Sequence, residues 1–334
     1  MLPLDYSKSL FDNIIPVFSY NKNEDIIEGK NAAKEKLIEL LGLHKIKQLC
    51  TSNNITIEYD EFAKDLGCRE IRFLVESEKD VFVPCHLFIP KYNLRQSLIV
   101  ALHGHCTGMH ILAGRKKHQI DFQTINEQNC DFAKQAINNG FAVLTFEHRG
   151  FGERGGNDKG AQCSELSLRT MLAGRTLIGD RVLDAINAID AVYSNFSEDI
   201  SCKETICIGY SGGGTIALYL SALYEKIHHT VIVSAISTFK DSIGAMPHCA
   251  CNYVPNIVEY FDMGDICQLI APRALTIISG KEDKIFPLSG AKESINKAMD
   301  FYSAHNARDK LTHIIAREGH KFYPEEVWNC LNAN

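Results

Sequence analysis

Residues 209–214 read Gly-Tyr-Ser-Gly-Gly-Gly and connect the apolar run 205–208 to a stretch with helical character. A serine that stands clear of the backbone at the end of a strand needs a very tight turn. In that turn the positions two before and two after the serine cannot carry side chains. Gly209 and Gly213 occupy those positions. The sequence therefore predicts a strand, a sharp turn that exposes Ser211, and a helix.

The chain from residue 98 onward alternates short apolar runs with helix-like stretches, which is typical of buried parallel strands joined by crossover helices. The expected strands are 98–102, 141–146, 205–208, 230–234, 273–279 and 311–315, and the expected helices are 121–139, 179–194 and 215–224. Earlier runs that alternate apolar and polar residues predict antiparallel strands at 53–59, 69–76 and 81–89. The fold class predicted is α/β, a mostly parallel sheet with helices on both faces and antiparallel strands at its N-terminal edge.

The first part of the chain differs from the rest. Residues 24–49 carry helical periodicity, which predicts an N-terminal helical arm over residues 1–50, packed on a domain formed by 51–334. A chain of 334 residues with no internal repeat and no low-complexity linker fits one α/β domain. We therefore expect a single domain overall.

Two further residues follow predicted strands at positions suited to catalysis. Asp283 comes after the run 273–279, and His320 comes after 311–315. An aspartate after a strand is most often a turn former, but Ser211, Asp283 and His320 in this order match a Ser-Asp-His triad. In such a triad the histidine takes the serine proton, while the aspartate fixes the imidazole tautomer and stabilises the imidazolium.

The turn 103–108 follows the first parallel strand and predicts half of an oxyanion hole. We assign one backbone N–H donor to His105, with Cys106 as the alternative, and the other to Gly212, directly after the serine. The other interpretation is that the two histidines of this turn, His103 and His105, only pack beside it. A second turn, 147–154, lacks the spacing of a phosphate loop, and we expect its arginine at position 149 to pair with a carboxylate.

Charge and hydropathy exclude some classes of partner. The net charge is −6 and no basic run is present, so nucleic acid is not expected as a partner. No stretch reaches the 18 or so apolar residues of a membrane span, and the first ten residues do not form a signal peptide. These features predict a cytoplasmic protein with a small-molecule substrate, and they leave open whether the chain forms a homo-oligomer.

The chain has 12 cysteines, scattered and without a Cys-x-x-Cys pair. Several lie in apolar runs, where cysteine acts as a small hydrophobic residue, so we expect reduced thiols. The segment His248-Cys249-Ala250-Cys251 offers metal ligands, but nothing near it in the sequence supplies a second pair at zinc spacing. The sequence therefore predicts no metal site and no cofactor.

Together these segments resemble the α/β-hydrolase superfamily. Within it they are similar to acetyl xylan esterase and cephalosporin C deacetylase-like enzymes and to their dienelactone-hydrolase-like relatives. The matching segments are 102–105, 148–152, 209–214, 271–273, 280–283 and 318–320. The resemblance covers roughly residues 80–330. Dienelactone hydrolases use a cysteine nucleophile, whereas position 211 is serine. The resemblance implies a serine esterase that hydrolyses small acyl esters, acetyl esters among them, through an acyl-enzyme and without a cofactor.

Substrate choice depends on three long connections, 106–120, 154–178 and 237–268. The last contains an aromatic segment that can wall a short acyl pocket. The pocket residues predicted are Tyr210, Tyr253, Val254 and Tyr260. The alternative is that these aromatic residues close the core under a long loop.

Other functions use the same three residues. A thioesterase, an acyltransferase or a peptidase can carry an identical triad, and the sequence does not separate them from an esterase. A hydrolase scaffold that only binds a ligand is the non-catalytic alternative, and the complete Ser, Asp and His set argues against it.

Overall fold

The computed structural model describes residues 2–23, 25–46 and 54–332. Within these residues nine strands form one sheet, in the order β1-β2-β3-β5-β4-β6-β7-β8-β9. The strands are β1 (Ile55–Ala63), β2 (Cys68–Glu78), β3 (Val81–Pro90), β4 (Ser97–Leu102), β5 (Ala142–Phe146), β6 (Glu204–Tyr210), β7 (His229–Val233), β8 (Ala274–Gly280) and β9 (Leu311–Ala316). Neighbours from β1 to β5 pair antiparallel and those from β5 to β9 pair parallel. The predicted mixed sheet is confirmed.

Strand β4 illustrates why the central runs are wholly apolar. Successive side chains of a strand point to opposite faces of the sheet. Leu98, Val100 and Leu102 lie in one buried apolar cluster, while Ile99 and Ala101 lie in a second one. Both faces of the strand are therefore covered.

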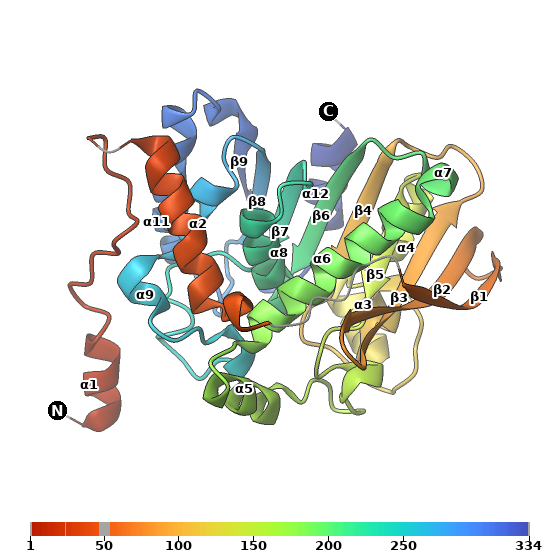
Figure 1. Ribbon diagram of the computed structural model, residues 1–334, viewed down its shortest axis with the longest axis horizontal. Coiled ribbons are helices and arrows are strands. Elements are labelled where there is room, and N and C mark those ends of the chain that lie inside the picture. The colour runs from red at the N-terminus through yellow and green to blue at the C-terminus, as the bar shows by residue number, and fades with distance from the viewer. Residues whose placement is uncertain (1, 24, 47–53, 333–334) are drawn as a thin grey trace.

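Helices from two groups cover these faces. The helices are α1 (Pro3–Ser9), α2 (Ile26–Leu40), α3 (Asp121–Gln128), α4 (Phe132–Asn138), α5 (Cys163–Leu172), α6 (Leu177–Asn195), α7 (Ser197–Ile200), α8 (Gly212–Leu223), α9 (Ile257–Tyr260), α10 (Met263–Ile266), α11 (Leu288–Ala304) and α12 (Pro324–Asn332). The larger core contains side chains of α2, α6, α8 and α11, and the second contains those of α3, α4 and α12. In Figure 1, α6 crosses in front of the sheet and α12 lies behind it.

One predicted helix is wrong in its length. The segment 121–139 forms two helices, α3 and α4, instead of one. Asn129 ends α3 with φ 56°, a left-handed conformation that asparagine tolerates better than most residues. The break lets the ring of Phe132 stack on Phe322, with ring centroids 4.4 Å apart.

The N-terminal arm shares the larger core. Ala33, Leu37 and Leu41 are buried in it, on or directly after α2. The predicted helical positions 47–49, strand position 53 and the boundary at 50/51 lie outside the described residues. Among the described helices, none combines the length and the apolar character needed to cross a membrane.

Candidate active site

Ser211 sits in a strained turn between β6 and α8. Its φ is 52° and its ψ is −120°, which is unfavourable for a residue with a side chain. A Cβ at Gly209 would clash with the carbonyl oxygen of Gly213, and one at Gly213 would clash with that of Leu102. Both glycines are therefore required by the close approach of backbone to backbone, as the sequence predicts.

Parallel pairing brings three side chains to one edge of the sheet. Ser211 follows β6, Asp283 follows β8 and His320 follows β9, and parallel strands end at the same edge. The His320 Nε2 atom lies 2.8 Å from the Ser211 Oγ atom, and the Nδ1 atom lies 2.8 Å from Asp283 Oδ2. The structure thus joins the predicted serine, histidine and aspartate in one hydrogen-bonded chain.

The backbone fixes the orientation of the Asp283 carboxylate. Its Oδ1 atom accepts hydrogen bonds from the backbone N–H of Ile285 at 2.8 Å and of Phe286 at 3.0 Å. The side chain is fully buried, and Oδ2 is left to face His320. In a buried site of low dielectric such a charge interacts more strongly with the imidazole than it would in water.

Further groups surround His320. The Tyr210 hydroxyl donates to the His320 carbonyl oxygen at 3.2 Å, and the Phe286 ring stacks on the imidazole with centroids 6.0 Å apart. The rings of His248 and Phe286 pack edge to face, with centroids 5.6 Å apart. Burial, with a smaller electrostatic contribution from His105 and His320, lowers the pKa of His248 to about 4. The sequence did not predict that Phe286 lies beside His320 or that His248 packs on Phe286. The position of Phe286, three residues after Asp283, was the available signal.

The turn after β4 lies against the turn that holds Ser211. A Cβ at Gly104 would lie 3.1 Å from the carbonyl oxygen of Tyr210 and 3.2 Å from the Ser211 Cβ, and one at Gly212 would lie 2.6 Å from the His105 Nδ1 atom. Within the described residues, the backbone N–H groups of His105 and Gly212 donate to no other group. Among the described residues both predicted oxyanion donors are therefore left without a backbone acceptor, on adjoining turns.

Comparisons with known proteins address the fold. No protein-family model matches the chain. Over 200 residues it is 26% identical to "Putative hydrolase YtaP" of Bacillus subtilis (strain 168); this match spans 57% of the chain and 62% of that relative. A protein from Bacteroides fragilis NCTC 9343 described as a "putative acetyl xylan esterase" superposes with a TM-score of 0.80 at 12% identity, covering 100% of this chain and 94% of that one.

A glucuronoyl esterase of carbohydrate esterase family 15 from Caldicellulosiruptor kristjansonii superposes with a TM-score of 0.63 at 16% identity, covering 96% of this chain and 89% of that one. The chain has the α/β-hydrolase fold. The predicted resemblance to this superfamily and to the acetyl xylan esterases is confirmed at the level of the fold.

Two buried polar groups, Glu147 and His103, lie at the predicted oxyanion turn. The Glu147 carboxylate accepts the backbone N–H of Met109 at 3.0 Å and lies 3.4 Å from the His103 Nε2 atom. Burial opposes a charge on His103, but Cys106 and Glu147 outweigh it and raise the pKa of His103 to about 10. His103 and the Glu147 carboxylate therefore lie together beside this turn, and Glu147 holds the backbone of Met109 that follows it.

The predicted pairing of Arg149 is also confirmed. Its guanidinium lies 2.8 Å from carboxylate oxygens of both Asp184 and Glu78. Asp184 also pairs with Arg154 at 2.6 Å. The turn 147–154 is therefore fixed to α6 and β2 by a buried ion-pair network.

The predicted pocket residues lie in different surroundings. Tyr210 contacts His320, whereas Val254 is buried in the larger core. Tyr260 packs against Phe18 of the N-terminal arm, with ring centroids 6.3 Å apart. The side chain of Tyr253 is 41% exposed. A role of any of these four residues in an acyl pocket stays a prediction.

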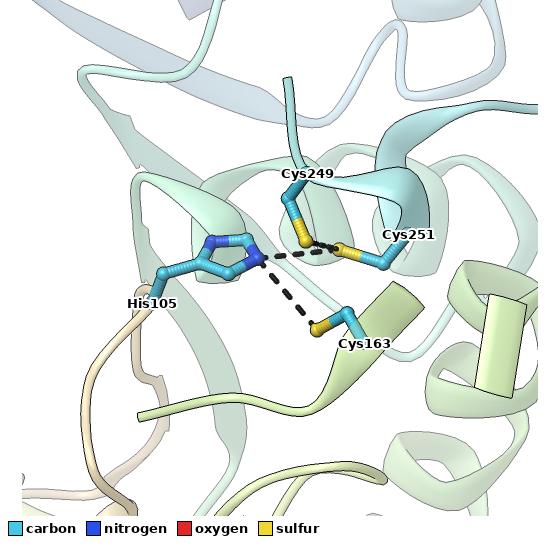
Figure 2. A group of neighbouring side chains, drawn as sticks. All are labelled: His105, Cys163, Cys249 and Cys251. Carbon is cyan, nitrogen blue, oxygen red and sulfur yellow. Dashed lines mark hydrogen bonds between the residues drawn. The ribbon is translucent and has the colours of Figure 1, made fainter. Parts of the chain in front are cut away.

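Figure 2 shows a further group that sequence reasoning missed, which we call the Cys₃His cluster: His105, Cys163, Cys249 and Cys251. The His105 Nε2 atom and the three sulfur atoms all lie within 4.8 Å of one another. Two of the four belong to the segment 248–251, whose metal-binding potential the sequence discounted for want of a second pair. The structure supplies that pair from His105 and Cys163, which are 58 residues apart, a separation that no spacing rule covers. His248 is outside the cluster and pairs with Asn252 through its Nδ1 atom at 2.9 Å.

Proposed function

We propose that this protein is a serine hydrolase that cleaves small carboxylic esters, acetyl or other short acyl esters, through an acyl-enzyme. The observation that carries the proposal is the chain of two 2.8 Å hydrogen bonds from the Ser211 Oγ atom through His320 to Asp283. A nucleophile, a base within hydrogen-bond reach and a group that orients the base are the parts that acyl transfer requires.

The proposed reaction begins with attack on the ester. The Ser211 Oγ atom bonds to the carbonyl carbon while His320 Nε2 takes the hydroxyl proton, and Asp283 stabilises the imidazolium that forms. The carbonyl oxygen becomes an oxyanion, which accepts hydrogen bonds from the backbone N–H groups of His105 and Gly212. Preorganised donors at this position commonly contribute the largest share of catalysis.

The second half releases the products. The tetrahedral intermediate collapses, the bond to the alcohol oxygen breaks, and His320 gives its proton to the leaving alcohol, which leaves an ester on Ser211. A water molecule then attacks that ester while His320 takes one of the water protons. Collapse of the second intermediate returns this proton to Ser211 and releases the carboxylic acid.

The surroundings of His320 support a short acyl group. The rings of Phe286 and Tyr210 lie against the imidazole, with centroids 6.0 and 5.4 Å away. We propose that they limit the length of the acyl group. The names of the structurally similar proteins, an acetyl xylan esterase and a glucuronoyl esterase, agree with an ester substrate.

Hydrolysis of p-nitrophenyl acetate by the wild type and by Ser211→Ala tests the proposal. We expect the variant to lose at least about 10⁴-fold in kcat with its fold intact by circular dichroism. Ser303→Ala removes an exposed hydroxyl on α11 and serves as the matched control, with activity unchanged. Retention of more than about a tenth of the wild-type rate by Ser211→Ala would contradict the assignment.

A further inference from the structure

The Cys₃His cluster has the spacing of a metal site. The Sγ atoms of Cys249 and Cys251 are 3.3 Å apart, and the His105 Nε2 atom lies 3.3 Å from Cys251 and 3.9 Å from Cys163. Around a tetrahedral zinc ion, with bonds of about 2.3 Å to sulfur and 2.0 Å to nitrogen, the ligand atoms are roughly 3.5–3.8 Å apart. Small side-chain rotations would therefore bring all four atoms to bonding distance of one ion.

A buried cation beside the cluster is an independent observation. Arg181 is only 2% exposed, and its guanidinium donates to the Cys163 Sγ atom at 3.1 Å and to the Arg149 carbonyl oxygen at 2.6 Å. Among the described residues it forms no ion pair with a carboxylate. A buried charge without a counter-charge is strongly destabilising, so the cluster must supply negative charge. Three thiolates, a neutral imidazole and Zn²⁺ sum to one negative charge, which matches Arg181.

Two metal-free states fit less well. A disulfide between Cys249 and Cys251 requires the sulfur atoms to approach to about 2.05 Å, and it would be neutral, so Arg181 would keep an uncompensated charge. A single thiolate would supply the charge but would leave the other soft donors with only weak thiol hydrogen bonds. A zinc ion uses all four donors and balances the arginine.

We propose that His105, Cys163, Cys249 and Cys251 bind one zinc ion in a tetrahedral structural site. Binding displaces the three thiol protons to solvent. Four protein ligands leave no open position for substrate or water, so the ion has a structural role. Apolar groups around the sulfur atoms, Phe151 and Leu177 among them, keep water from the inner side, and the more exposed His105 leaves a path for entry.

The site ties the predicted oxyanion turn to two other loops. His105 lies in the turn after β4, and Cys163 is the first residue of α5. Cys249 directly precedes the short helical turn Ala250–Asn252, and Cys251 lies within it. The imidazole that would bind zinc through Nε2 also lies over Gly212. Zinc would therefore fix the backbone of His105 beside that of Gly212. This consequence for catalysis rests on the proposed function, whereas the metal site itself does not.

Metal analysis of the full-length protein, expressed with added zinc and purified without chelator, tests the proposal. We expect about one zinc per chain, with X-ray absorption showing three sulfur neighbours near 2.3 Å and one nitrogen near 2.0 Å. Replacement by Co²⁺ should give thiolate-to-cobalt charge-transfer and tetrahedral d–d absorption. Wild-type protein that binds neither ion, or whose zinc has only oxygen and nitrogen neighbours, would overturn the site.

Variants locate the ion. Cys163→Ser and Cys251→Ser should each purify with less than about a tenth of the wild-type zinc, since a serine hydroxyl is a poor zinc ligand. Cys202→Ser is the matched control, because this half-buried thiol donates to the Ile200 carbonyl oxygen, away from the cluster, and it should keep the full zinc content. A Cys251→Ser variant that retains full zinc would contradict the assignment.

Measurements on the wild-type protein make the test independent of whether the variants fold and of whether the protein is an active esterase. If the serine variants fail to fold, cobalt binding by chelated wild-type protein decides the question. A Cys249–Cys251 disulfide in metal-free protein purified under reducing conditions would overturn the proposal. Wild-type protein that holds zinc with this sulfur coordination but lacks esterase activity would contradict the proposed function alone, and wild-type protein that hydrolyses esters but binds neither zinc nor cobalt would contradict the zinc site alone.

Discussion

The Ser211–His320–Asp283 triad and the Cys₃His cluster both unite side chains that are distant in the sequence, but different parts of the fold assemble them. Each triad residue follows a strand of the parallel half of the sheet, so strand pairing alone brings the three to one edge. The ligands of the cluster lie on turns, at residue 105, at the start of α5 and around residue 250. Sheet topology determines the first arrangement and loop packing the second.

The two regions also differ in their proposed roles, which are chemistry and support. In these proposals the triad makes and breaks covalent bonds, while the cluster, with zinc bound, holds the turn that carries His105. Damage to the two regions should therefore differ in size and in kind, from a near-complete loss of activity at the triad to partial losses around the turn.

The largest effects on activity are expected when triad residues are replaced, singly or together. His320→Ala should lower kcat for p-nitrophenyl acetate by at least about 10⁴-fold, because within the described residues His320 is the base that contacts the Ser211 hydroxyl. The double variant with Ser211→Ala should be scarcely worse than either single variant, since the residues act as a unit. Steady-state kinetics of the three proteins checks this, and fully multiplicative losses would show that the two residues act separately.

Metal loss should have a smaller effect of a different kind. Cys251→Ser leaves the triad in place but releases the turn, so we expect kcat to fall about 10- to 100-fold, less than the loss of an oxyanion donor often costs. Cys202→Ser should retain wild-type kcat. A fall as large as that of His320→Ala would place the cluster in the chemistry, and an unchanged kcat would separate it from the oxyanion turn.

Acyl-chain length tests the space beside His320. If the rings of Phe286 and Tyr210 limit that space, as proposed, kcat/KM should peak at acetyl to butyryl p-nitrophenyl esters and fall by at least about tenfold at octanoyl. A series of esters at a fixed enzyme concentration gives the answer. A maximum at octanoyl would mean that the long loops form a channel and would favour a lipase or a long-chain thioesterase.

The smallest effect is expected at Asp121, which binds Thr107 of the predicted oxyanion turn. Asp121 is fully buried and accepts hydrogen bonds from Thr107 Oγ1 at 2.6 Å and from the backbone N–H of Lys117 and His118 at 2.7 Å each. Burial alone would raise the pKa of Asp121, but these bonds and the contact of the His110 Nε2 atom at 2.9 Å lower it to about 2. Asp121→Asn should therefore cost about 2 kcal/mol of unfolding free energy at neutral pH.

The pH dependence has a definite sign. The pKa of Asp121 in the folded protein is below the ordinary value of 3.8. Ionised Asp121 therefore contributes its full share of the unfolding free energy at pH values above 3.8, and this contribution is lost as the pH falls through about 2. Urea unfolding at pH 7 and pH 3 should show a smaller difference between wild type and Asp121→Asn at the lower pH. Glu127→Gln, at an exposed position of α3, is the control, and an equal difference at both pH values would contradict this role.

The sequence predicted the parts of the molecule that follow from strand order. Ser211, Asp283 and His320 were predicted to lie together because each follows an apolar run, and parallel runs end at one edge. Asn129 was not recognised as a helix break, because nothing in the sequence around it distinguishes its left-handed conformation from a helical one.

The meeting of His105 with Cys163 could not be predicted either, because it depends on how two loops fold back over the sheet. Neither loop has a periodicity that reports its direction. The same holds for His248, whose position beside Phe286 results from the path of the long connection before β8. The sequence therefore predicts the triad from local patterns, whereas the cluster requires the folded chain.

The most direct test of the central claim, that Ser211 is the nucleophile, is the site of covalent labelling. The protein is incubated with a fluorophosphonate, digested, and mapped by mass spectrometry. A single adduct on the peptide that carries Ser211, absent from His320→Ala and still formed by Cys251→Ser, is the result expected. An unlabelled Ser211 in folded wild-type protein, or an adduct on a cysteine of the Cys₃His cluster, would contradict the claim.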